Sequence, residues 1–264
     1  MAKEMLFHYT KLQNVKGIIR NDAIHMYSFY FRKYAKDDYL WIKNYSKDIV
    51  EEICKENNWA YDADDLTIQP YFISFCEDCD SKYMWENYAE NGHGVKFIFD
   101  KRFIKECVHV IPDIRGRNTE AIETTLPCIY IEDKDKLKEA ILVNIERPEL
   151  QKWNYLDRLR FLVSAIKQTK PYEEEKEYRH IHLYPIVFTA NYNDGNFYIQ
   201  DDNGPTDYKD MWVDMLFPKE MLLGIEMGPS TTKEDLTEVR EHMKSVGLDP
   251  LKTKVFHYGS DKIE

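Results

Sequence analysis

The sequence has no long hydrophobic segment. No apolar run approaches the roughly 18 residues that can span a membrane, and the opening residues Met1 to His8 lack the apolar core of a signal peptide. The five cysteines are odd in number and scattered, which does not suit a disulfide framework. We therefore expect a protein of a reducing cytoplasm, without a membrane partner. Cys76 and Cys79 have the spacing of half a zinc site, but no second cysteine pair follows, so no metal is predicted.

Positive charge is also in short supply. The chain has 36 Lys and Arg against 47 Asp and Glu, a formal net charge of -11 and a pI near 5.3. This balance argues against a broadly basic face for duplex nucleic acid, because phosphate binding requires clustered Lys and Arg. A local pocket for an anionic small molecule or for a nucleic-acid end remains open.

Glycine and proline are too few to form a linker, and the chain has no internal repeat or low-complexity tract. Hydrophobic residues make up 43% and aromatic residues 14%, which excludes a disordered chain. We predict one α+β domain over residues 1–264, with an aromatic and helical insertion at 28–66. Arg32, Lys33 and Lys36 lie among the aromatic residues of that insertion and could help to stack bases, but such a stretch more often covers a core.

The hydrophobic pattern predicts a strand at residues 6–9, followed by a helix that opens on a capping box from Thr10 to Gln13. A strand at 71–75, a helix capped by Ser81 and a strand at 95–99 follow with short links. Further strands are expected at 126–131 and in the C-terminal third. Apolar residues at helical spacing predict helices from Asp133, over 155–166 and over 231–245.

The charge run from Glu173 to His182 concentrates most of the possible chemistry. If this stretch is a strand, Glu175 and Glu177 point to one face about 6.6 Å apart, and Arg179 follows on the same face. The alternative is a solvated strand end. His180 and His182 fall on the opposite face from Glu177 and lack a third metal ligand.

Three ordered segments carry a resemblance. They are Leu6-Phe-His-Tyr-Thr10, then Phe72-Ile-Ser-Phe75 with Met84-Trp-x-x-Tyr-Ala89 and Gly94-Val95, and finally Glu175-Lys-Glu-Tyr-Arg179. Together they resemble the bacterial domain-of-unknown-function family 2971, over residues 6 to 245. That family is in turn similar to the ADP-ribosyltransferase fold, a split pair of β-sheets that holds NAD between them.

The resemblance implies roles for particular residues. His8, with Tyr9 and Thr10 beside it, would contact a ribose of NAD, and either Ser74 or Tyr88 would shape the nicotinamide site. Glu177 would be the catalytic glutamate, and Glu175 would prepare the acceptor. Arg179 would orient Glu177 or meet a phosphate, unless it forms an ordinary structural salt bridge.

Cleavage of the nicotinamide bond develops positive charge on the ribose, which a carboxylate stabilises. The expected function is therefore an NAD-consuming ADP-ribosyltransferase or NAD glycohydrolase of a bacterial cytoplasm, in toxin or phage-defence biology. Its acceptor would be a protein or a nucleic acid. The alternative is a non-catalytic nucleotide- or protein-binding module on the same fold, and a metal-dependent nuclease is a weaker third possibility.

Overall fold

The structure is a computed structural model. It describes residues 4–28, 48–59, 68–77, 81–106, 108–110, 122–185, 190–193, 196–201, 204–207, 212–249 and 252–259. The aromatic part of the predicted insertion (29–47), the polar break at 62–65, the polar loop at 113–118 and Cys79 lie outside the described residues. The descriptions below concern the described residues alone.

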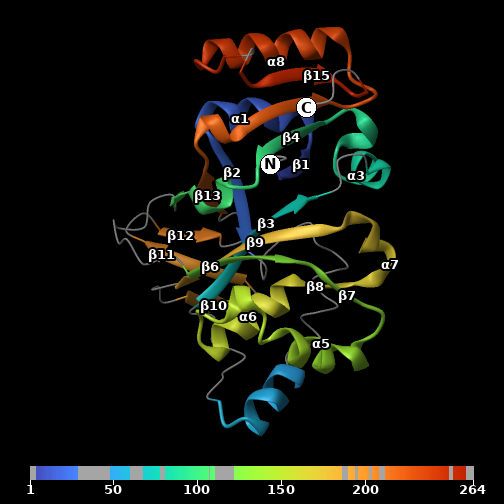
Figure 1. The fold of residues 1–264 in the computed structure, drawn as a ribbon. Helices are drawn as coiled ribbons and strands as arrows, with labels where there is room; N and C mark the ends of the chain where they lie inside the picture. Colours follow the sequence, from blue (N-terminus) through green and yellow to red (C-terminus); the bar gives the residue numbers. More distant parts are fainter. Residues whose placement is uncertain are drawn as a thin grey trace.

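A large, mainly antiparallel β-sheet organises the molecule, and ten of the described strands belong to it (Figure 1). Two smaller sheets accompany it, one of three strands and one of two parallel strands. The large sheet contains β1 (Met5–Thr10), β2 (Ala23–Ser28), β3 (Ile68–Cys76), β4 (Val95–Asp100), β5 (Val108–Val110), β6 (Ile122–Pro127), β9 (Glu177–Pro185), β13 (Trp212–Leu216), β14 (Leu222–Met227) and β15 (Lys254–His257). The smaller sheets contain β10 (Ala190–Asn193), β11 (Asn196–Asp201) and β12 (Gly204–Asp207), and β7 (Ile129–Ile131) with β8 (Ile166–Gln168).

Strand β3 is the centre of the large sheet. One of its edges pairs with β9 along the whole strand, from Ile68 opposite Pro185 to Cys76 opposite Glu177. The other edge pairs with β2 near its start and with β1 at its end, so these two strands continue into different parts of the sheet. One branch runs through β1, β4, β14 and β15, and the other runs through β2, β13 and β5. The sheet is therefore divided on one side of β3.

Helices cover both ends of this sheet. In Figure 1, α1 and α8 lie at one end, α5, α6 and the helical residues 48–56 lie at the other, and β3, β9 and β6 run between them. The helices are α1 (Val15–Asn21), α3 (Lys82–Asn87), α4 (Phe103–Glu106), α5 (Leu137–Asn144), α6 (Tyr155–Ala165), α7 (Thr169–Tyr172) and α8 (Lys233–Ser245). Short 3-10 turns are η1 (Leu12–Asn14), η2 (Glu90–Gly92), η3 (Lys134–Lys136), η4 (Pro148–Leu150), η5 (Glu173–Glu175) and η7 (Lys219–Met221).

Three hydrophobic clusters correspond to these layers. The first lies between the β1 and β14 branch and helices α1 and α8, with Phe97 and Phe99 at its centre. The second joins Ile181 and Leu183 of β9 to α5, α6 and the helix at 48–56. The third packs Trp85 of α3 against β1. The face of β9 that carries Ile181 and Leu183 is thus covered by α6, and Glu177 and Arg179 lie on that same face.

Most predicted elements are present, with three differences in detail. Thr10 is the last residue of β1 and caps no helix, because η1 begins at Leu12 after an N-cap residue, Lys11, that makes no side-chain cap hydrogen bond. The predicted strand at 126–131 is divided, since β6 ends at Pro127 and β7 belongs to another sheet. Residues 103–106 form the short helix α4 before β5. The caps predicted at Ser81 and the helices over 155–166 and 231–245 are confirmed.

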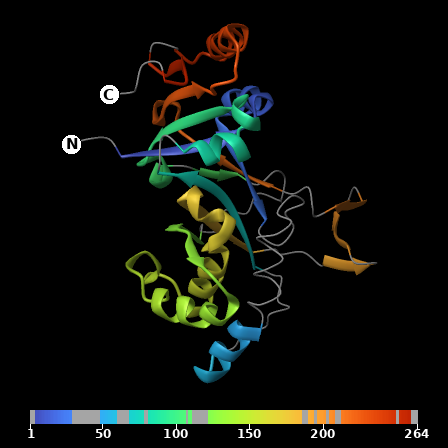
Figure 2. The ribbon, with the colours of Figure 1, turned by 90° about the vertical axis from the view of Figure 1, so that its right-hand side faces the viewer.

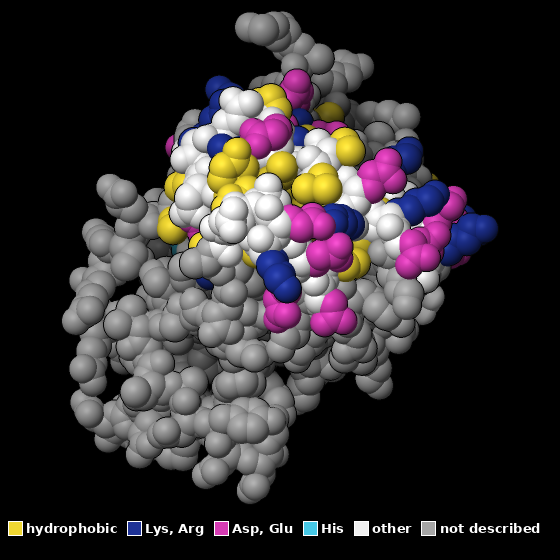
Figure 3. Space-filling model, turned by 90° about the horizontal axis from the view of Figure 1, so that it is seen from below, with side chains coloured by type: hydrophobic (Ala, Val, Ile, Leu, Met, Phe, Trp, Pro, Cys, Tyr) yellow, Lys and Arg dark blue, Asp and Glu magenta, His cyan; other side chains and the backbone are white. Residues whose placement is uncertain are grey.

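The surface adds two observations. The three-stranded sheet of β10, β11 and β12 stands away from the main body (Figure 2). The described part of the face seen from below mixes Lys and Arg with Asp and Glu, and hydrophobic side chains lie between them (Figure 3). On that described area, positive charge does not gather into a patch. Among the described helices, none has the length and apolar character to cross a membrane.

Candidate active site

Two buried glutamates lie where a 3-10 turn meets the first residue of β9. Glu175 ends η5, Lys176 has left-handed backbone angles, and Glu177 begins the strand. The prediction that both glutamates share one strand is therefore wrong, because the left-handed residue Lys176 separates the 3-10 turn from the strand. Both side chains are nevertheless almost completely buried, with Glu175 1% and Glu177 4% exposed. Glu173 and Glu174 are exposed, as a solvated turn requires.

Glu177 is held by donors from three other residues. Its Oε1 accepts from Arg179 Nε at 2.7 Å and from the Ser74 hydroxyl of β3. Its Oε2 accepts from Lys167 Nζ at 2.7 Å and from Arg179 Nη2 at 3.3 Å. A carboxylate offers about four acceptor positions. The protein's own donors therefore occupy all the positions that Glu177 offers.

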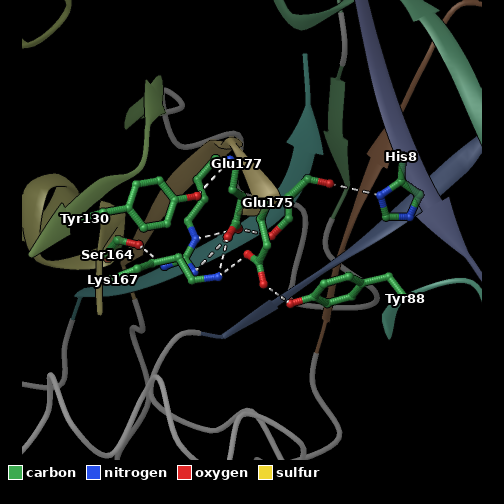
Figure 4. Close-up of polar contacts among 9 residues, drawn as sticks. His8, Tyr88, Tyr130, Ser164, Lys167, Glu175 and Glu177 are labelled. Atoms are coloured by element: carbon green, nitrogen blue, oxygen red, sulfur yellow. Dashed lines mark hydrogen bonds and ion pairs between the residues drawn. The ribbon is translucent and has the colours of Figure 1, made fainter. Parts of the chain in front are cut away.

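Glu175 has fewer partners than Glu177. Its Oε1 accepts from the Tyr88 hydroxyl of α3, and its Oε2 accepts from Lys167 Nζ. Tyr88 is 38% exposed, so Glu175 is hydrogen-bonded to a residue that reaches the surface. Figure 4 shows the two carboxylates directed toward Lys167, with Tyr88 approaching Glu175 from the other side.

Arg179 is fixed in place by contacts on every side. Besides its bonds to Glu177, its Nη1 donates to the carbonyl of Ser164 near the end of α6, and its guanidinium lies 4.4 Å from the centre of the Phe72 ring. The last carbonyls of a helix have no partner within the helix, so this bond also satisfies the end of α6. Of the roles considered for Arg179, these contacts favour the orientation of Glu177 over contact with a phosphate.

The two carboxylates have pKa values displaced in opposite directions. Burial alone would raise the pKa of Glu177, but the charges of Arg179 and Lys167 outweigh burial and hold its pKa well below the ordinary value. For Glu175, burial and the negative charge of Glu177 raise the pKa to about 7, although Lys167 opposes the rise. Burial also raises the pKa of the Tyr88 phenol, with a further contribution from Glu175, so Tyr88 is a neutral donor. At neutral pH, Glu177 is ionised and Glu175 is divided between its two protonation states.

His8 and Ser74 lie on neighbouring strands beside this cluster. The Nδ1 atom of His8 lies 3.0 Å from the backbone carbonyl oxygen of Ser74, while the Ser74 hydroxyl contacts Glu177. Both side chains are half-buried. The structure therefore brings His8 of β1, Ser74 of β3, Tyr88 at the end of α3 and the two glutamates of η5 and β9 together.

Tyr9 and Thr10 make contacts of a different kind. The Tyr9 ring packs edge-on against Trp85, with ring centres 5.0 Å apart, in the third hydrophobic cluster. The hydroxyl of Thr10 accepts a hydrogen bond from Asn14 at 2.9 Å. These are packing and turn contacts, and they give no support to the ligand-binding role expected for the two residues. Trp85 is a core residue, 3% exposed.

On the opposite face of β9, His180 and His182 are buried next to β6. His180 Nδ1 lies 2.9 Å from the Thr125 hydroxyl, and both rings lie 3.9 Å from the Glu123 carboxylate. Within the described residues, no group of three or more His, Cys, Asp and Glu side chains has a geometry that could hold a metal ion. Cys76 is a free thiol in the core.

Lys167 is the member of the cluster that the sequence did not reveal. It follows α6 in β8 and is 3% exposed, and its ammonium lies 4.7 Å from the centre of the Tyr172 ring. The available signal was a lysine directly after the mainly apolar segment from Val163 to Ile166. A lysine that follows an apolar helix usually lies in solvent, so this signal is weak.

The arrangement combines an ionised carboxylate with a titrating one. Glu177 can stabilise positive charge that develops next to it, and Glu175 can take up a proton near neutral pH. Tyr88 gives the second carboxylate a hydrogen-bonded connection to the surface. These two functions are the ones that a glycosyl-transfer reaction with a separate acceptor requires.

Residues 84–180 match a family model described as Protein of unknown function (DUF2971). The matched range contains Tyr88, Lys167, Glu175, Glu177 and Arg179, whereas His8 and Ser74 precede it. No curated protein and no solved structure matches the chain. The similarity to that family thus covers both glutamates of the cluster, and the family's description gives no activity.

Proposed function

We propose that this protein consumes NAD and transfers ADP-ribose to an acceptor or to water. The observation that supports the proposal best is the hydrogen-bonded group of His8, Ser74, Tyr88, Glu175 and Glu177, drawn from four separated parts of the chain. Those residues were expected to act together from the sequence alone. An ionised Glu177 beside the ribose would stabilise the positive charge that develops as nicotinamide leaves.

Ser74 would have to give way when the substrate binds. All four acceptor positions of Glu177 are occupied, and three of those bonds come from cations that a neutral ribose hydroxyl would not displace. The Ser74 hydroxyl is the neutral donor among them, and its residue is half-buried. In the proposed reaction, a ribose hydroxyl takes the place of the Ser74 hydroxyl on Oε1 of Glu177.

Glu175 would then serve the acceptor. Its pKa of about 7 allows it to remove a proton from an acceptor hydroxyl or from water at neutral pH. Tyr88 is partly exposed and donates to Glu175, so an approaching acceptor would contact Tyr88 before it reaches Glu175. The proposal leaves the acceptor open between a protein, a nucleic acid and water.

The experiment is a measurement of nicotinamide release from NAD by the wild-type chain and by two variants. Glu177→Gln is expected to lower the rate by about 100- to 1000-fold, the loss typical of removing one electrostatic stabiliser of a transition state. Glu173→Gln, on the exposed turn just before it, is the matched control and should keep the full rate. Because Glu177 lies between two buried cations, each melting temperature is measured first, and rates are compared well below the lowest one.

Absence of nicotinamide release by the wild type, without an NAD-dependent rise in melting temperature, would contradict the proposal. Acceptors are tested separately by following labelled ADP-ribose into added protein, RNA or single-stranded DNA. Incorporation identifies a transferase, whereas release of free ADP-ribose identifies a glycohydrolase.

One observation favours a second candidate, a non-catalytic nucleotide- or protein-binding module. A carboxylate whose acceptor positions are all taken by the protein's own donors is also what a purely structural ion cluster requires. The two candidates differ in one outcome. Equal binding of NAD by the wild type and Glu177→Gln, with no turnover by either, supports the binding module.

A further inference from the structure

We propose that Lys167 is a positioning residue, which holds Glu175 and Glu177 together through one hydrogen bond to each and so determines which of the two carboxylates takes up a proton. The structural part of this inference stands on contacts within the chain. Its consequence for catalysis rests on the function proposed above.

The geometry of the shared ammonium is the first support. Lys167 Nζ donates to Oε2 of Glu177 at 2.7 Å and also to Oε2 of Glu175. All three side chains are at most 4% exposed. The glutamates come from η5 and from β9, and Lys167 comes from β8, which belongs to a different sheet. The ammonium is thus the point at which three separately placed elements meet.

The charges of the cluster are the second support. Arg179 directs Nε and Nη2 to Glu177 and Nη1 to the Ser164 carbonyl. Lys167 is the cation that Glu175 shares. If Lys167 were neutral, two buried carboxylates would face one arginine, and adjacent like charges in a buried site cannot both stay ionised. The pair would then hold an extra proton at neutral pH.

This division of labour has a catalytic consequence. With Lys167 in place, Glu177 remains the anion that would stabilise the ribose, and Glu175 is the carboxylate that exchanges its proton with the acceptor. Without the ammonium, Glu175 would stay protonated up to a higher pH and would lose its capacity to act as a base near neutrality. Lys167 itself would touch neither the substrate nor the reacting atoms.

The experiment follows the carboxyl carbon signals of 13C-labelled glutamate by NMR from pH 4 to 10, with Glu175→Gln to assign the signal of Glu175. In the wild type, Glu175 is expected to titrate near pH 7. In Lys167→Met, its midpoint should move to a higher pH, because the nearest cation is gone. Lys96→Met is the matched control: Lys96 is 2% exposed and ion-paired to Glu226, and its loss should leave the Glu175 midpoint unchanged. An unchanged midpoint in Lys167→Met, or an equal change in both variants, would overturn the proposal.

A second measurement covers the case in which Lys167→Met folds poorly. The double variant Lys167→Met/Glu175→Gln removes one cation and one carboxylate, which restores the balance between Glu177 and Arg179. Glu175→Gln should raise the melting temperature of Lys167→Met by more than it raises that of the wild type, a coupling that independent sites do not show. An equal or smaller rise in Lys167→Met would also overturn the proposal.

Neither measurement uses NAD, so the inference and the proposed function can fail separately. If the wild type consumes NAD, the pH profile of Lys167→Met should shift to more alkaline pH, in step with the NMR midpoint. A shifted midpoint in a chain that never consumes NAD would reject the proposed function and keep the positioning role. If the wild type consumes NAD but Lys167→Met changes neither the NMR midpoint nor the pH profile, the positioning role is rejected and the proposed function is kept.

Discussion

Two buried ion clusters among the described residues are built differently. In the first, Lys96 of β4 pairs with Glu226 of β14, its direct neighbour across the sheet, and the ammonium lies within 6 Å of three aromatic ring centres. In the second, Lys167 serves Glu175 and Glu177, and Arg179 completes the group. The first cluster has one cation for one carboxylate within one sheet, whereas the second divides one cation between two carboxylates from different elements.

The difference separates a structural ion pair from a site that can titrate. In the Lys96–Glu226 pair, the two charges compensate each other across two paired strands. A shared ammonium leaves one carboxylate under-compensated, and burial then raises its pKa into the physiological range. Perturbed carboxylates of this kind are typical of functional sites. The second cluster is therefore the candidate functional site, and the first cluster is a structural ion pair with which it can be compared.

Breaking the first cluster should have the largest effect on stability. Lys96→Met leaves the buried carboxylate of Glu226 without its cation, and loss of one partner of a buried pair costs about 3–5 kcal/mol in unfolding free energy. Urea unfolding measures this loss. Lys96→Met combined with Glu226→Leu should recover most of it, because both charges are then absent. A single variant as stable as the double one would show that the pair is not a compensated structural unit.

The second cluster should make the stability of the fold depend on pH. The pKa of Glu175 is about 7 in the folded chain against 4.5 in an ordinary environment. A raised pKa stabilises the fold fully below about pH 4.5, and this stabilisation is lost as the pH rises through 7. At about 1.4 kcal/mol for each pH unit, the loss amounts to about 3 kcal/mol.

Glu175→Gln, which cannot ionise, should remove this dependence between pH 4.5 and 7. Unfolding free energies of the wild type and the variant, measured across that interval, test the prediction, and Glu173→Gln serves as the exposed control. Glu177 has the opposite sign: its lowered pKa stabilises the fold above about pH 4.5 and ceases to do so as the pH falls further. Parallel curves for the wild type and Glu175→Gln would contradict the assignment of a titrating Glu175.

A smaller effect is expected when the second cluster keeps its charge but loses its geometry. Arg179→Lys retains a cation, but an ammonium cannot reproduce the planar set of bonds to Glu177 and to the Ser164 carbonyl. Hydrogen bonds to charged groups contribute about 1.5–3 kcal/mol, and we expect a loss in that range by urea unfolding. Arg20→Lys, at an exposed position of α1, is the control and should change stability by less than about 1 kcal/mol.

Much of this fold follows from local sequence patterns. The alternation of Val95, Phe97 and Phe99 predicts β4, and the spacing of apolar residues predicts α6 and α8. The pattern could not show that β4 is buried on both faces. Lys96 looks like a solvent-facing residue in the sequence, and its burial depends on Glu226, which lies opposite it only because β14 pairs with β4. Long-range strand pairing is information that no local window contains.

The candidate site divides in the same way. Glu175, Glu177 and Arg179 are close in sequence, and the family resemblance implied that they act together with His8, Ser74 and Tyr88. The left-handed turn at Lys176 was not foreseen, because lysine has no special preference for that conformation. Lys167 was missed for a different reason. Its burial results from the packing of β8 beside η5 and β9, and an isolated lysine carries no pattern that predicts such packing.

The smallest predicted effect concerns Tyr88, the partly exposed residue that donates to Glu175 of the second cluster. Tyr88→Phe removes the hydroxyl that donates to Glu175 and should cost about 1 kcal/mol, the net value of a typical hydrogen bond. That bond favours the ionised carboxylate, so its loss should also move the Glu175 midpoint above 7 in the NMR titration. Tyr83→Phe, on the same helix, is the control. If Tyr88→Phe leaves the midpoint unchanged, Lys167 alone sets the protonation of Glu175, and Tyr88 contributes packing.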